Sequence, residues 1–64
     1  MTLDKNTLSF VADNMMARTQ AERIMRENAR RDGKTAIAIM HGDRAQAFTE
    51  AAIAIRTMLK DPLP

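Results

Sequence analysis

The sequence predicts an all-α fold, an antiparallel helical hairpin, and three observations lead to it. One turn signal, at residues 31–34, divides a 64-residue chain into two long segments without proline. Within each segment, hydrophobic residues recur at helical spacing. The composition, with six methionines, two phenylalanines and no tyrosine or tryptophan, favours helix over sheet.

The first segment, about 4–31, contains no glycine or proline, so we expect one helix with Asp4 or Asn6 as its N-cap. At about 100° per residue, one broad face collects apolar side chains. This expected inner face consists of Leu3, Phe10, Val11, Ala17, Ala21, Ile24, Met25 and Ala29. The i,i+4 pairs Glu22–Arg26 and Glu27–Arg31 are expected on the solvent side.

Three further apolar residues, Leu8, Met15 and Met16, do not fit this face. A lone hairpin would leave them in water, and three within a short stretch indicate a second contact surface. This is the basis for predicting self-association.

Asp32-Gly33 is typical of a helix stop, with Gly33 in the left-handed conformation after the last turn. The turn is therefore expected at 32–34, followed by a second helix over about 35–60 and a tail at 61–64, where proline ends the helix.

The second helix leaves two alternatives open around Gly42. A continuous helix places one apolar face on Ile37, Met40, His41, Ala45, Phe48, Ala52, Ile55 and Leu59, at a cost of about 1 kcal/mol for Gly42. Alternatively the helix is kinked or broken near Gly42, and Thr35–Met40 is a short helix or a strand. We favour helix throughout.

The chain is expected to be a single domain, 1–64, too small to be stable without a disulfide, a metal or a partner subunit. It has no cysteine and one histidine, so we expect no metal and no cofactor, and homo-oligomerisation remains as the way to complete the core. No apolar segment approaches the ~20 residues of a membrane span, and no leader is visible. We therefore expect a cytoplasmic protein.

We see no catalytic constellation and expect a non-enzymatic, homo-oligomeric binding or regulatory protein that acts through protein contacts, such as a phage- or plasmid-type inhibitory factor. Packing within the hairpin is expected through Phe10, Ala17, Ala21, Ile24, Phe48, Ala52, Ile55 and Leu59. The predicted oligomer interface comprises Leu8, Met15, Met16, Phe10, Phe48 and Ile55.

An alternative function is anion recognition, of RNA, DNA or a small nucleotide, at a subunit interface. Arginine outnumbers lysine, and its guanidinium suits phosphate. The candidate anion-binding residues are Arg18, Arg30, Arg31, Lys34 and Arg44. A net charge of +2 is too balanced to indicate nucleic acid by itself.

The layout of two helices of similar length around one turn resembles the plasmid-encoded Rop-type hairpin. This resemblance implies a dimeric four-helix bundle and concerns architecture alone. Residues 42–55 also resemble the last helix of phage proteins that sequester cyclic nucleotides in oligomeric pockets, although the spacing differs and the tryptophan often found there is absent.

Overall fold

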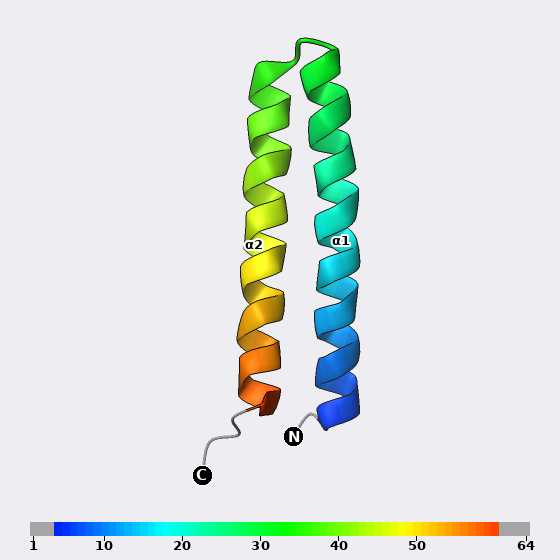
Figure 1. Ribbon diagram of the computed structural model, residues 1–64, viewed down its shortest axis with the longest axis vertical. Helices are drawn as coiled ribbons and strands as arrows, with labels where there is room; N and C mark the ends of the chain where they lie inside the picture. The colour runs from blue at the N-terminus through cyan, green and yellow to red at the C-terminus, as the bar shows by residue number, and fades with distance from the viewer. Residues whose placement is uncertain (1–3, 61–64) are drawn as a thin grey trace.

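The computed structural model describes residues 4–60, and they form an antiparallel pair of helices (Figure 1). Helix α1 spans Lys5–Arg31 and helix α2 spans Thr35–Lys60, with no strand among the described residues. The predicted all-α fold of two helices packed against each other is confirmed, and each helix begins and ends within one residue of the expected position. Neither helix combines the length and the apolar character needed to cross a membrane. Leu3 and the predicted tail, 61–64, lie outside the described residues.

Both ends of α1 carry the expected signals. The Thr7 backbone N–H donates to Oδ1 of Asp4 at 2.7 Å, so Asp4 is the N-cap. At the other end, Gly33 has φ of +73°, and the N–H groups of Gly33 and Lys34 donate to the Arg30 and Ala29 carbonyls. A left-handed residue with these bonds closes the helix and starts the turn.

Helix α2 runs through Gly42 without interruption, so the helix is not broken there. Thr35–Met40 is helical and not a strand. An added Cβ at Gly42 would lie 3.3 Å from Cδ of Arg26, so the glycine leaves room for a side chain of α1 against the backbone of α2.

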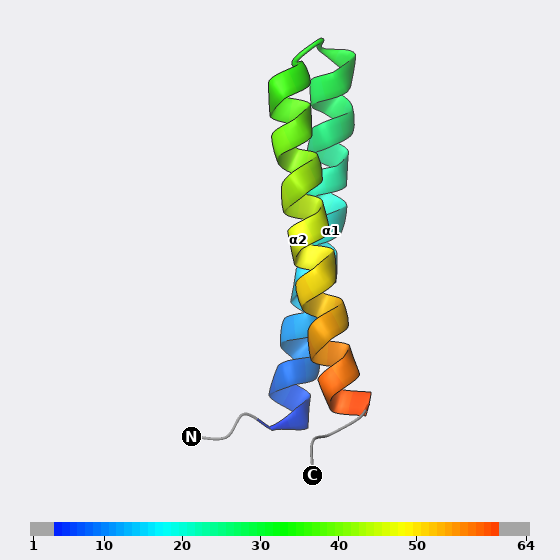
Figure 2. The ribbon, with the colours of Figure 1, turned by 90° about the vertical axis from the view of Figure 1, so that its left-hand side faces the viewer.

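The helices meet through residues spaced seven apart, the repeat of a coiled coil, and Figure 2 shows them crossing at a shallow angle. Ala38, Ala45 and Ala52 supply the contact on α2. Every buried hydrophobic residue among those described is an alanine, so the core is thin. The buried residues of α1 are Ala12, Thr19, Glu22 and Ala29.

The predicted inner face of α1 is wrong for most of its described residues, although Ala29 is buried and Val11 is half-buried. Phe10 is 67% exposed and Ile24 62%, and Ala17 and Ala21 are also exposed. Ala12 and Thr19 lie at the contact in place of Phe10 and Ile24, because alanine and threonine let the two backbones approach closely and bulky side chains do not.

Leu8, Met15 and Met16, which were expected outside the hairpin, are instead half-buried. On α2 the prediction holds better: Ala52 is fully buried and Phe48, Ile55 and Leu59 are half-buried. The most exposed hydrophobic side chains are therefore not Leu8, Met15 and Met16, the three residues that indicated a second contact surface.

Candidate functional site

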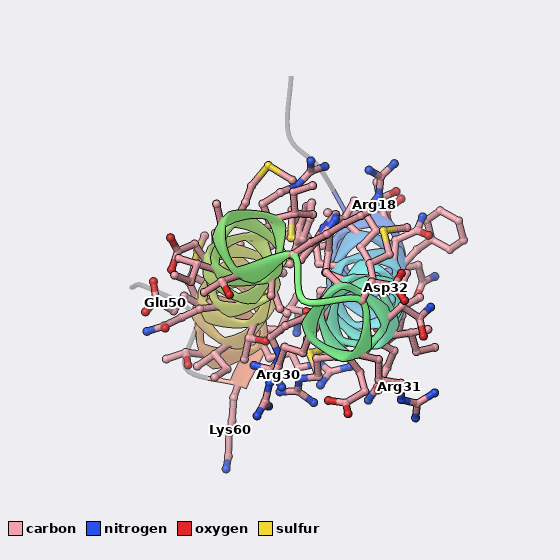
Figure 3. The ribbon with its side chains drawn as sticks, turned by 90° about the horizontal axis from the view of Figure 1, so that it is seen from above. Arg18, Arg30, Arg31, Asp32, Glu50 and Lys60 are labelled. Atoms are coloured by element: carbon pink, nitrogen blue, oxygen red, sulfur yellow. The ribbon has the colours of Figure 1, made fainter. Side chains whose placement is uncertain are left out.

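A pair of helices forms a flat layer with two broad faces, and in this hairpin the two faces differ in chemistry. Figure 3 looks along the helices and shows Arg18 and Arg30 projecting on opposite sides of the layer. Residues seven apart lie in one row along a helix, because seven residues make almost two turns. The rows that contain these arginines define the two faces.

The first face, the apolar face, carries one row from each helix beside the contact between them. On α1 Arg18 lies between Val11 and Met25, and its guanidinium carbon is 5.8 Å from the centroid of the Phe48 ring. The row of α2 is Ile37, Arg44, Ala51 and Met58. Met25, Ile37 and Met58 are 46%, 44% and 56% exposed, so water covers much of their apolar surface.

A buried carboxylate ties the helices together under the apolar face. Glu22, whose side chain is 8% exposed, accepts from Nδ1 of His41 at 2.5 Å and from Nε of Arg44 at 3.1 Å. A buried charge is tolerated when partners surround it, and such groups hold one register between helices. The sequence suggested an exposed Glu22–Arg26 pair, which does not form, whereas the Glu27–Arg31 pair forms at 3.9 Å.

A second polar contact crosses the layer at Thr19 and Thr49. Thr19 is fully buried, and its hydroxyl donates to the Met15 carbonyl at 3.0 Å. The Thr49 hydroxyl donates to the Ala45 carbonyl at 2.9 Å and lies 3.2 Å from the Thr19 hydroxyl. Both hydroxyls are committed to backbone acceptors one turn back, so their role is structural.

The opposite face, the groove face, contains two adjoining hollows of about 530 and 280 Å³. They share Arg26, Gly42 and Gln46, so they form one groove along the contact between the helices. Arg23 lines the smaller hollow and Arg30 the larger one. The groove therefore gathers three arginines from α1.

The predicted anion-binding residues are not brought together. Arg18 and Arg44 belong to the apolar face, whereas Arg30 lines the groove. Arg31 is exposed and pairs with Glu27, and Lys34 lies in the turn.

Arg23 and Arg26 line the groove, although the sequence placed Arg26 on the solvent side, paired with Glu22. A usable signal existed in Gly42, since a glycine inside a helix often marks a close approach of another group.

The residues of the predicted oligomer interface are also divided. Met15, Phe48 and Ile55 fall in the same rows as Glu22 and His41, beneath the apolar face. Met16 is in the row of Arg23 and Arg30, and Phe10 is on the outer side of α1 with Ala17 and Ile24. Leu8 continues the row of Met15.

Among residues 4–60, no three histidine, cysteine or acidic side chains come close enough to form a metal site. No protein-family model matches the sequence, and neither the curated proteins nor the solved structures contain a significant match.

Proposed function

We propose that this chain is a non-enzymatic helical binding protein that pairs with a second copy of itself through the apolar face. The observation that supports this most strongly is the composition of the core. The buried hydrophobic residues of the described chain are five alanines, while eight large hydrophobic side chains remain exposed.

Alanine burial alone does little to offset the cost of ordering the chain. Fully burying an isoleucine, methionine or phenylalanine contributes about 1.5–3 kcal/mol, whereas fixing the backbone costs about 1–2 kcal/mol per residue. Small domains compensate with disulfides, metals or partners. This chain has no cysteine. A second copy on the apolar face would cover Met25, Ile37 and Met58, three of these eight exposed side chains.

The apolar face is large enough for such a pairing. A helix of 26 residues is about 39 Å long, and the hairpin is 19 Å across. A rectangle of this size measures about 700 Å², so two copies can bury at most roughly 1,500 Å², which reaches the ordinary size of a specific interface. Two hairpins joined face to face about a two-fold axis form a four-helix bundle.

The charged groups on this face are compatible with contact. Arg44 is matched by the Glu22 carboxylate, and Arg18 lies over the Phe48 ring. Both guanidinium groups have long stems that reach the rim of an interface while their methylene groups pack inside.

Pairing through the apolar face leaves the outer row of α1 uncovered, namely Phe10, Ala17 and Ile24. The proposal assigns contacts with a further protein to this row, in keeping with a regulatory role. It also keeps the cytoplasm as the location, which suits a chain without cysteine.

A matched pair of substitutions tests the pairing. Ile37 and Ile39 are two residues apart on α2 and are 44% and 60% exposed, but only Ile37 lies in the apolar row of Arg44. Ile39 lines the groove. Ile37→Glu places a charge in the interface and is expected to weaken association about tenfold or more, whereas Ile39→Glu leaves it unchanged.

Sedimentation equilibrium at micromolar concentration measures both variants beside the parent chain, and circular dichroism confirms that each is helical. A parent chain that is folded and monomeric at about 100 μM, or two variants that dissociate equally, would contradict the proposal.

A further inference from the structure

We infer that the groove opposite the apolar face is a binding site for a compact phosphate-bearing ligand, held by Arg23, Arg26 and Arg30. This inference goes beyond the proposed pairing and does not depend on it, because the groove remains open when the apolar faces meet.

The size of the groove suits a small molecule. Its larger hollow, about 530 Å³, falls within the range of ligand pockets, and the smaller one extends it toward Thr49. One wall of the larger hollow is apolar, made by Ala38 and Ile39, while the arginines of α1 supply the donors. A few polar groups against an apolar wall are typical of sites that orient a ligand.

The positive charges of the groove are not balanced within the described chain. Neither Arg23 nor Arg26 forms an ion pair with any residue of 4–60, and the partner of Arg30, Glu27, is 3.9 Å away. Asp43 is the one carboxylate that lines the groove. Asp43 and the Glu27 carboxylate, which Arg30 shares with Arg31, offset part of the charge of the three guanidinium groups. The groove keeps an excess of positive charge, which an anion would neutralise.

Gly42 holds this arrangement together. A Cβ at this position would lie 3.3 Å from Cδ and 3.9 Å from Nη1 of Arg26, so the arginine lies directly against α2 where the side chain is missing. Packing of this kind restricts the stem of Arg26 before a ligand arrives, so the Arg26 side chain loses less conformational entropy when the ligand binds.

The donors favour phosphate over other anions and small ligands over single strands. The planar guanidinium forms paired hydrogen bonds with phosphate oxygens, and three such groups suit a group with several oxygens such as a diphosphate. The groove begins beside Thr35, at the N-terminus of α2, where the helix dipole also favours negative charge. No aromatic side chain lines it, so it offers no surface on which a base would stack.

Calorimetry with inorganic pyrophosphate at low salt tests the site, using the full chain. We expect saturable binding with one site per chain and a rise in melting temperature with ligand. Arg26→Gln is expected to weaken binding about tenfold or more, since it removes a charged donor. Gly42→Ala should also weaken it by displacing the Arg26 side chain.

Lys5→Gln is the matched control, because it removes one positive charge from the exposed first residue of α1, which lines neither hollow. The inference requires that this variant binds pyrophosphate like the parent chain. Equal losses in Lys5→Gln and Arg26→Gln would show attraction to net charge and overturn the inference, as would absence of pyrophosphate binding by the parent chain.

A single-stranded RNA oligonucleotide distinguishes the source of the phosphate. The inference expects RNA to bind more weakly than pyrophosphate at the same salt concentration. Tight RNA binding that falls steeply with salt, together with weak pyrophosphate binding, would identify a polymer site and contradict a small-molecule groove.

Discussion

Ala52 is completely buried where the helices meet, and its replacement by leucine tests whether alanine sets the distance between them. Leucine adds three carbon atoms at a position with no exposed surface. Overpacking of this kind costs about 1–3 kcal/mol, because side chains or backbones must move apart. In a domain of this size each kcal/mol shifts the melting temperature by about 4–8 °C, so a loss of roughly 5–20 °C is expected.

Ala54→Leu is the control, since Ala54 lies two residues away on the same helix and is exposed. Its effect should stay within about 0.5 kcal/mol, because both residues are good helix formers and nothing is crowded. Urea unfolding followed by circular dichroism compares the two variants at one protein concentration, so that association does not enter the difference. If Ala52→Leu is as stable as Ala54→Leu, the close alanine contact is not what holds the helices together.

Two further predictions concern charged groups. Glu22→Gln keeps the volume of the side chain but removes the charge that pairs with His41 and Arg44, and it should lower the free energy of unfolding by about 1–3 kcal/mol. Glu27→Gln, at an exposed site, should change the free energy of unfolding little. Equal urea midpoints for the two variants would contradict this prediction. The Thr7 backbone N–H holds the pKa of Asp4 below its usual 3.8, so the carboxylate stabilises the helix above that pH and the effect is lost as the pH falls through the lowered pKa. The difference in stability between the parent chain and Asp4→Asn should therefore be smaller at about pH 2.5 than at about pH 6. Thermal unfolding at both pH values measures this difference. A difference that stays constant would be evidence against the charged cap.

The positions and ends of the helices were predictable because they depend on residues within one turn of each other. The Asp4 cap needs only the N–H of Thr7, and the stop at Gly33 needs only a residue that tolerates a positive φ. The helix through Gly42 was favoured for the same reason, since one glycine costs too little to break a long helix.

The candidate sites were less predictable, because they depend on which residues of two distant segments face each other. Arg18 and Arg44 were grouped with Arg30 as candidate anion-binding residues, but they lie on the apolar face of the hairpin, whereas Arg30 lines the groove. Arg26 was taken as an ordinary solvated residue, because its importance arises only when Gly42 lies opposite it.

By itself the sequence determined two helices, one turn and more apolar surface than two helices can bury between them. The tertiary structure alone decided which side of α1 faces inward. Apolar residues occur on several sides of that helix, so hydrophobic periodicity did not single out one face. Close packing selected Ala12 and Thr19 over Phe10 and Ile24, because small side chains allow the backbones to approach and let Glu22 reach its partners.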